Sequence, residues 1–303
     1  MLSSTARRIA RRGCSSNVAA MNKRMRGCSS NATAMNSLMQ ELPSIYKIAA
    51  MQITPMWKHM AEHASVKLKL APTTILDLAC GPGEPACTLA KTFPNASVTA
   101  SDFTDGMLAQ AQERVAENGL GDQVTVAKLD FNDLSSIASE SIDLVTCSLG
   151  LHIPVDGPSQ ALSEISRVLK PGGTCIATIW EEVNMCDLCM KTMEEVTGEP
   201  FQMPFDPVAW AGGRMDPLIA DAGLTLASGH NSLVPFDFNL GVARGGEDLS
   251  FKLGMIMALP KLAQMGKVEE AKATYEKHAK AFGLNEKGEL VIAQDYRLLV
   301  FKK

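Results

Sequence analysis

Short apolar runs alternate with amphipathic stretches between residues 70 and 180. The runs are four to seven residues long and mostly apolar or β-branched, which is typical of strands buried in a parallel sheet. They occupy residues 75–78, 97–100, 124–127, 142–147 and 174–180. Between them, stretches such as "DGMLAQAQERVAEN" and "SQALSEISRVLKPGG" have helical spacing and end at glycines. The alternation predicts right-handed βαβ units and a parallel sheet covered on both faces.

The chain after residue 180 is patterned differently. Residues 181–224 are rich in Met and Pro and predict an irregular connection with short helices, followed by a sixth strand over 224–234. Residues 246–283 have helical spacing, and 289–303 predict a last strand. The expected fold is therefore α/β, a Rossmann-like, doubly wound, mostly parallel seven-stranded sheet. Its helical lid segments, near residues 181–224 and 240–288, should cover the carboxyl edge, where such sheets bind ligands.

Charge separates a basic head from an acidic body. The net charge of the 303 residues is −4, yet residues 1–40 contain seven Lys and Arg and no Asp or Glu. This head is rich in Ser, Ala and Met and repeats "RGCSSN" at 12–17 and 26–31. The composition predicts a mitochondrial transit peptide, with a plastid peptide or a disordered basic tail as the alternatives. Residues 41–303 are expected to form one domain.

Composition argues against several kinds of binding partner and site. The acidic body argues against a nucleic-acid binder, which would cluster Lys and Arg. The sequence has no run of 18 apolar residues, so no membrane span is expected. Its cysteines fall in strands and turns rather than in a disulfide framework. Cys186-x-x-Cys189 lacks a second pair, so we expect two thiols on a lid helix and no metal site.

The segment "ILDLACGPGEPA", residues 75–86, predicts a strand, a glycine turn and a helix that begins at Glu84. Gly81 and Gly83 permit a tight turn and close approach of a ligand. Free N–H groups at the helix start would suit an anionic or carboxylate-bearing ligand. The letters also satisfy a dinucleotide fingerprint, with Asp102 19 residues after Gly83. The turn alone leaves both cofactor classes open.

Several motifs together distinguish the two classes. "LDLACGPG", "VTASDFTDGML", Asp130-Phe131, "IDLVTCSLGLHIPVD" and "RVLKPGG" follow one another over residues 70–180. This set resembles the class I S-adenosylmethionine-dependent methyltransferases, in particular the small-molecule branch that includes the ubiquinone/menaquinone C-methyltransferases. The resemblance implies an enzyme that binds S-adenosylmethionine and releases S-adenosylhomocysteine. Ala79 stands where the family commonly has the first of three glycines.

The resemblance also implies roles for individual residues. Asp77 should face the ammonium group of the cofactor or, alternatively, cap the turn. Asp102 should accept hydrogen bonds from both ribose hydroxyls. Asp130 should accept one from the adenine amino group, and Ser148 and Leu149 should lie beside the sulfonium. The full set of expected cofactor-binding residues is Tyr46, Asp77, Ala79, Gly81, Gly83, Asp102, Phe103, Met107, Asp130, Phe131, Ser148 and Leu149. Tyr46 or Trp57 could face the sulfonium through its ring, although both could equally be core aromatics.

His152 is the candidate catalytic residue. It follows the fourth strand in "GLHIP", where a neutral imidazole could remove a proton from the acceptor. Many family members have a second His beside it, and here that position is Ile153. A positional or structural role is the alternative, since alignment alone can promote methyl transfer.

The methyl acceptor is less well specified. Met and aromatic residues concentrate in the lid segments, which suits a hydrophobic or amphipathic small molecule but also suits plain lid packing. They are Met185, Met190, Met193, Met203, Met215, Met255, Met257, Trp180, Phe201, Phe205 and Trp210. The sequence does not distinguish O-, N-, S- and C-methylation, nor does it give the oligomeric state. The hypothesis of another class is a non-catalytic protein of this fold that serves as an organellar assembly or scaffolding factor.

Overall fold

The structure is a computed structural model that describes residues 43–154, 156–201, 203, 206–242, 249–282, 286 and 289–303. The basic head predicted over residues 1–40 lies outside this range. The side chains of residues 43–51, 235–242, 249, 250 and 253 also lie outside the described part.

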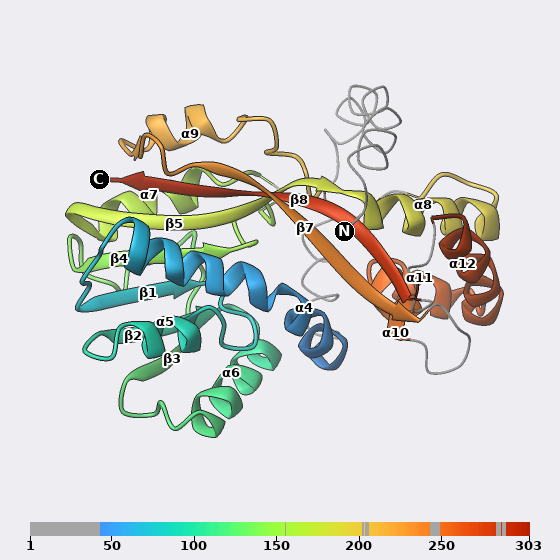
Figure 1. Cartoon of the computed structure of the whole chain (residues 1–303), viewed down its shortest axis with the longest axis horizontal. Coiled ribbons are helices and arrows are strands. Elements are labelled where there is room, and N and C mark those ends of the chain that lie inside the picture. The colour runs from blue at the N-terminus through green and yellow to red at the C-terminus, as the bar shows by residue number, and fades with distance from the viewer. Residues whose placement is uncertain are drawn as a thin grey trace.

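Eight strands of the described chain form one sheet in the order β3-β2-β1-β4-β5-β8-β6, and β7 pairs with β8 (Figure 1). The five parallel strands are β1 (Thr74–Leu78), β2 (Ser97–Asp102), β3 (Val124–Lys128), β4 (Ile142–Ser148) and β5 (Leu169–Val183). The antiparallel strands are β6 (Thr225–Leu226), β7 (Ser232–Val242) and β8 (Glu289–Lys302). The predicted doubly wound, mostly parallel α/β sheet is confirmed.

Helices cover both faces of this sheet. On one face lie α4 (Pro43–Glu62), the π-helical turn η1 (His63–Lys67), α5 (Ala86–Thr92) and α6 (Asp105–Glu117) (Figure 1). On the other face lie α7 (Ser159–Val168) and α9 (Asp216–Asp221). The apolar face of α7, for example Leu162 and Ile165, is fully buried there. Each face therefore has its own hydrophobic core, as expected for a parallel sheet.

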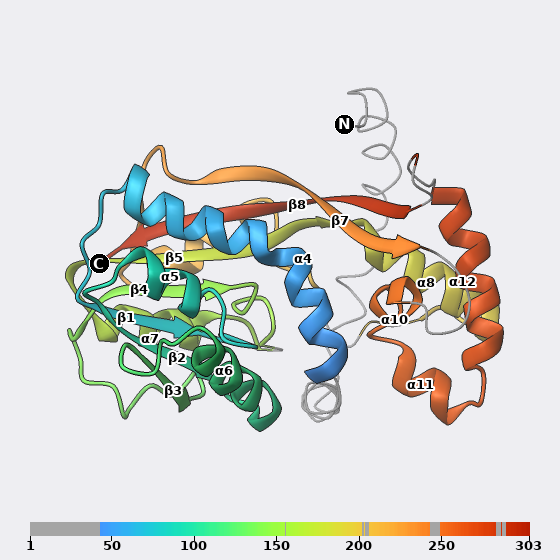
Figure 2. The ribbon, with the colours of Figure 1, turned by 60° about the horizontal axis from the view of Figure 1, so that its bottom comes forward.

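Three strands extend far beyond the others. Ser148, the last residue of β4, pairs with Thr178, so β5 continues past Thr178 without β4 beside it. We call this extension the arm: residues 179–183 of β5, residues 289–297 of β8 and the β7 residues paired with them. Figure 2 shows the arm joining the sheet to a separate group of helices.

The helices at the end of the arm are α8 (Asn184–Thr197), α10 (Leu249–Gly254), α11 (Leu259–Gln264) and α12 (Val268–Phe282). Buried side chains such as Leu188, Phe251 and Tyr275 pack there against Leu290 and Ile292 of β8 in one continuous core with the α4 face. We call these four helices the helical lobe. None of the helices in the described ranges has the length and apolar character needed to cross a membrane.

The predicted lid segment 181–224 is divided between two places. Its first part forms α8 of the helical lobe, where Cys186 and Cys189 are free thiols. Its last part forms α9, and Met215 and Ile219 are buried against α7 on the opposite face of the sheet. Met215 and Trp210 therefore belong to the core of that face rather than to a lid.

Several element boundaries differ from the sequence-based prediction, including those of β5, which was expected over residues 174–180 and extends in both directions. The segment 224–234 forms two strands rather than one, because Gly229 at φ +75° turns the chain between β6 and β7. This division gives eight strands instead of seven. Helix α7 ends at Val168, before the glycines, because Leu169 is already extended and pairs with Ile142. Lys170 precedes a proline, a position that also favours extended backbone.

Candidate functional site

The glycine turn after β1 lies at the carboxyl edge of the sheet. Ala79, Gly81 and Gly83 have φ values of +52°, +51° and +91°, in the left-handed region that favours glycine. Ala79 is the exception, since a β-carbon there costs about 1–2 kcal/mol. A Cβ built on Gly150 would lie 2.8 Å from Ala79 Cβ and 2.6 Å from Cys147 Sγ. Gly150 is therefore required for this turn, and sequence reasoning missed it because the contact spans two strands.

Gly83 has a packing role in addition to its conformation. A Cβ on Gly83 would lie 3.1 Å from Ala111 Cα in α6. The glycine thus allows the turn to approach α6 closely. A side chain at this position would push against the helix. The role predicted for Gly83 toward the cofactor stays a prediction.

The backbone N–H groups of the turn are not free. Every N–H between Cys80 and Thr88 donates to an acceptor within the protein, and Pro82 and Pro85 carry none. Three acceptors are carboxylate oxygens at 2.9–3.0 Å, namely Asp77 Oδ2 for Ala86, Glu84 Oε2 for Thr88 and Asp102 Oδ2 for Gly81. The prediction of free N–H groups is wrong, because these three donate to acidic side chains of the same region and the others donate to backbone carbonyl groups. Helix α5 also begins at Ala86 rather than at Glu84.

Asp77 is fully buried in β1 beneath the turn. Its Oδ2 accepts the Ala86 N–H at 2.9 Å and its Oδ1 accepts the Thr146 hydroxyl at 2.7 Å. Burial raises the pKa of Asp77 to about 8, although these two hydrogen bonds act to lower it. The capping role considered as an alternative is present in the geometry, and the carboxyl group would ionise readily only beside a cation.

Asp102 is the last residue of β2 and is also buried. Its Oδ2 accepts the Gly81 N–H at 3.0 Å, and its Oδ1 accepts both the N–H and the hydroxyl of Thr104 at 3.0 and 2.8 Å. A carboxylate has about four acceptor positions. One position, on Oδ2, is left for a ligand hydroxyl, and a second would require the Thr104 hydroxyl to rotate away.

The turn therefore has a definite electrostatic character. The carboxyl groups of Asp77 and Asp102 are held by N–H and O–H donors, and Glu84 meets Arg114 at 3.4 Å. A pyrophosphate would meet acidic side chains here and no free N–H donor, which opposes its binding. The same arrangement attracts a ligand that carries a positive group near Asp77.

The residues predicted at the adenine position lie beyond β3. Phe131 is buried, and Asp130 is exposed, with its Oδ1 accepting the backbone N–H of Asn132 at 2.8 Å. Phe103 is half-buried after β2, and Met107 is buried in α6. Phe103 and Met107 come after the end of β2 and Asp130 and Phe131 after the end of β3, so all four follow strands at the edge that carries the turn.

Ser148 ends β4 at this edge, and Leu149 follows it. The Ser148 hydroxyl lies 3.3 Å from Thr178 Oγ1 and donates to Met56 Sδ of α4 at 3.7 Å. Leu149 has a φ of +57°, and its N–H donates to the Thr178 carbonyl at 3.0 Å. Helix α4 thus covers the end of β4. Trp57 of α4 is a buried core residue, while the side chain of Tyr46 lies outside the described part.

His152 follows Leu151 and is buried, with 6% of its surface exposed. Desolvation lowers the pKa of His152 to about 4. The imidazole is therefore neutral at pH 7 and can accept a proton, although such a low pKa makes it a weak base.

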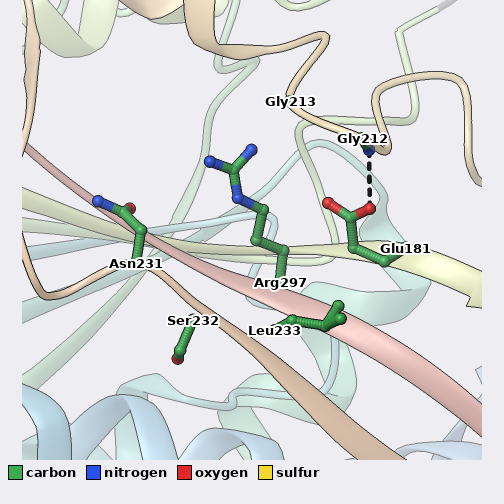
Figure 3. A pocket seen from close by; sticks show the side chains of 7 residues that line it. All are labelled: Glu181, Gly212, Gly213, Asn231, Ser232, Leu233 and Arg297. Atoms are coloured by element: carbon green, nitrogen blue, oxygen red, sulfur yellow. Dashed lines mark hydrogen bonds between the residues drawn. The ribbon is translucent and has the colours of Figure 1, made fainter.

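A cavity of about 360 Å³ opens on the face of the sheet opposite α4. It is lined by Glu181, Gly212, Gly213, Asn231, Ser232, Leu233 and Arg297 (Figure 3). Glu181 accepts the Gly212 N–H at 2.7 Å, and Arg297 forms a two-point ion pair with Asp216 at 2.7 and 3.0 Å. The cavity contains none of the predicted cofactor-binding residues. Its two charged side chains, Glu181 and Arg297, already bind Gly212 and Asp216.

Part of the chain is similar in sequence to known methyltransferases. Residues 75–173 match a protein family described as "Methyltransferase domain". The chain is 41% identical over 103 residues to the ubiquinone/menaquinone biosynthesis C-methyltransferase UbiE of Desulfotalea psychrophila, which covers 34% of this chain and 39% of that protein. It is 32% identical over 132 residues to the protein of the same name from Geotalea daltonii, covering 43% of this chain and 54% of that protein. The match thus spans about half or less of these relatives.

Solved structures show a similar fold. A Bacillus halodurans structure is 20% identical with a TM-score of 0.53, covering 82% of this chain and 98% of that one. The [4+2]-cyclase SpnF is 18% identical with a TM-score of 0.51, covering 81% of each chain. At these identities the similarity concerns the fold alone.

Proposed function

Because residues 75–173 match a methyltransferase domain within a class I methyltransferase fold, we propose that this chain transfers a methyl group from S-adenosylmethionine to a small organic acceptor. The observation that carries the proposal is the acidic lining of the glycine turn. Asp77 and Asp102 surround it, and its N–H groups are already bonded. That environment suits the ammonium group of S-adenosylmethionine and opposes the pyrophosphate of NAD.

The described residues fit this cofactor. Asp77 would face the ammonium group, and the remaining acceptor position of Asp102 Oδ2 would take one ribose hydroxyl. Asp130 and Phe131, beyond β3, would bound the adenine ring. Ser148 and Leu149, at the end of β4, would lie beside the sulfonium.

S-adenosylmethionine supplies an electrophilic methyl group, which an acceptor displaces in line from the sulfonium. The protein aligns the acceptor with that methyl group and excludes water around the end of β4, where α4 covers Ser148. The neutral imidazole of His152 is the group proposed to accept the proton that the acceptor loses. An acceptor that is already nucleophilic would need only the alignment.

We propose a hydrophobic or amphipathic small molecule as the acceptor. The named relatives are C-methyltransferases of ubiquinone and menaquinone biosynthesis, which favours an acceptor carbon. Met193 and Met255 are fully buried in the helical lobe, in the same core as α4. Their adaptable side chains would suit an apolar ligand.

Calorimetric titration with S-adenosylmethionine, S-adenosylhomocysteine, NAD and NADP tests the proposal. We expect micromolar binding of the first two compounds only. Asp102→Asn should weaken it at least tenfold, because a charged acceptor contributes about 1.5–3 kcal/mol. Thr104→Val is the matched control, since it removes only the hydroxyl donor to Asp102 Oδ1, and it should retain the affinity.

Three results would contradict the proposal: binding of a nicotinamide cofactor, binding of nothing, or equal affinity in Asp102→Asn. Binding alone does not establish turnover, since one structure of similar fold is a cyclase. Transfer of a labelled methyl group to an apolar acceptor distinguishes the enzyme from a non-catalytic assembly or scaffolding factor. A protein that binds the cofactor and methylates nothing would support the second hypothesis.

A further inference from the structure

One face of the arm continues the site from β4 toward the helical lobe. Thr178 of β5 pairs with Leu298 of β8, and Trp180 pairs with Tyr296. Antiparallel partners point to the same side of a sheet, and Gln294 follows on that side two residues from Tyr296. Tyr296 and Leu298 belong to the core shared with α4 and the helical lobe. A row of side chains therefore leads from the end of β4 to Gln294.

The polar groups at the start of this row have partners. The Thr178 hydroxyl lies 3.3 Å from the Ser148 hydroxyl, beside the expected methyl position. The Tyr296 hydroxyl lies 2.7 Å from His59 Nδ1 of α4. These contacts fix the two side chains between the sheet and α4.

Gln294 is different. Only 1% of its surface is exposed, and neither Oε1 nor Nε2 has a hydrogen-bond partner in the described chain. Along β8 its neighbours on the same face are Ile292 and Tyr296, both buried, and its partners in register are Val183 of β5 and Phe236 of β7. An amide enclosed in this way opposes folding, because it has lost its water and gained no bond. A leucine or methionine would fit the same apolar surroundings without that penalty.

We propose that Gln294 binds the methyl acceptor at the end remote from the methylated atom; this inference rests on the proposed function. An amide offers one acceptor oxygen and two donor hydrogens. Its complement is a ligand group with a donor beside an acceptor, such as a carboxamide or a hydroxy-ketone. The group is uncharged, because the described neighbours Val183, Ile292 and Tyr296 offer no compensation for a desolvated charge.

The spacing also limits the size of the acceptor. Gln294 and Leu298, the partner of Thr178, are four residues apart on β8, which is about 14 Å of extended strand. A molecule that reaches from Ser148 to Gln294 is therefore elongated and longer than one aromatic ring. The substrate class is an elongated, mostly apolar, neutral compound with a polar group at its far end.

The test compares the full-length wild type with Gln294→Met and with Gln160→Met. Methionine matches the length of glutamine, and Gln160 is an exposed glutamine on α7, so it controls for the chemical change. The probes are biphenyl-4-carboxamide, its N,N-dimethyl derivative, which has no N–H donor, and biphenyl-4-carboxylate. Each protein is saturated with S-adenosylhomocysteine and titrated with each probe, with ligand-observed NMR as the readout.

In the wild type we expect the carboxamide to bind about tenfold more tightly than the other two probes. Gln294→Met should abolish this preference and, without ligand, raise Tm by about 4 °C. Gln160→Met should change neither quantity. A lower Tm in Gln294→Met, no binding of the carboxamide to wild type, or an unchanged preference would overturn the inference. Absence of S-adenosylhomocysteine binding in all three proteins would instead refute the proposed function.

Discussion

Binding of the cofactor should be coupled to loss of a proton from the Asp77 carboxyl group. Its pKa is raised to about 8 by burial, so most of the carboxyl is protonated at pH 7 without ligand. A neighbouring ammonium group would favour the charged form and lower this pKa. Binding of S-adenosylmethionine at pH 7 should therefore release close to one proton from Asp77. Calorimetry in phosphate and in Tris, which differ in ionisation enthalpy, measures that release.

Asp77→Asn separates the binding role from the capping role. Its amide can accept the Ala86 N–H and donate to Thr146 Oγ1, so both contacts of the wild type can be kept. We expect this variant to fold with an unchanged or higher Tm, bind at least tenfold more weakly and lose the proton release. An affinity and a proton count equal to those of wild type would show that Asp77 only caps the turn.

At the residue scale the sequence predicts which residues lie near one another in the site, but not which hydrogen bonds their side chains make. Asp77, Asp102 and Gly81 were placed at one edge because each lies at or beside the carboxyl end of a strand, and parallel strands end together. Their hydrogen bonds depend on side-chain directions that no spacing specifies. For the same reason the unpartnered amide of Gln294 is invisible in the sequence, where it is one polar letter in an alternating strand.

The observed helices and strands agree closely with the predicted ones wherever the prediction rests on residues near in sequence. β1, β3 and β4 lie within one residue of their predicted bounds, and α6 ends before Gly119 as expected. The arm could not be predicted in this way. The residues of β7 alternate weakly, and their strand is stabilised by pairing with β8, some fifty residues later in the chain. Such long-range pairing overrides local propensity.

The contact between α4 and the turn before β7 depends on histidines. His63 Nε2 lies 3.2 Å from His230 Nδ1, and His59 meets Tyr296 at 2.7 Å. Two neutral imidazoles can share one hydrogen, whereas two protonated ones only donate and repel. Burial is the largest cause that lowers the pKa of both His59 and His63, and His230 lowers that of His63 further. Lys67 acts in the same direction on His63, whereas Glu62 opposes it.

This contact should weaken in acid. The unfolded chain, with ordinary histidine pKa values near 6.5, takes up protons before the folded one does. Stability is therefore complete above about pH 6.5 and falls as the pH drops below it. His230→Gln removes one imidazole and should reduce the loss of Tm between pH 7.5 and 5.5 by roughly 2–4 °C, the effect of about 1 kcal/mol. His278→Gln, in the helical lobe, is the comparison. His278 lies 3.1 Å from Glu195 Oε2, so its protonation forms an ion pair and this variant should not reduce the loss of Tm; an equal reduction in it would contradict the explanation.

The whole molecule combines an acidic folded body with a basic head. The two cores, as far as the structure describes them, are built from residues between Ile53 and Phe301. Helix α4 contributes fully buried side chains, including Met56 and Met60, and Ser148 contacts it at the end of β4. The fold and the site therefore share α4.

We propose that the head and the body are separable, the first directing the protein to mitochondria and the second folding and binding the cofactor. Residues 1–40 fused to a fluorescent protein should carry it into mitochondria, and the chain from residue 41 should match the full chain in Tm and in affinity for S-adenosylhomocysteine. Removal of residues 1–67 should abolish folding, because loss of Trp57 alone would cost about 3–5 kcal/mol of a total near 5–15 kcal/mol. A cytosolic reporter would refute the targeting role, with plastid import supporting the alternative address. A truncated chain from residue 41 that unfolds or loses affinity would refute the separation, because the head would then be part of the fold.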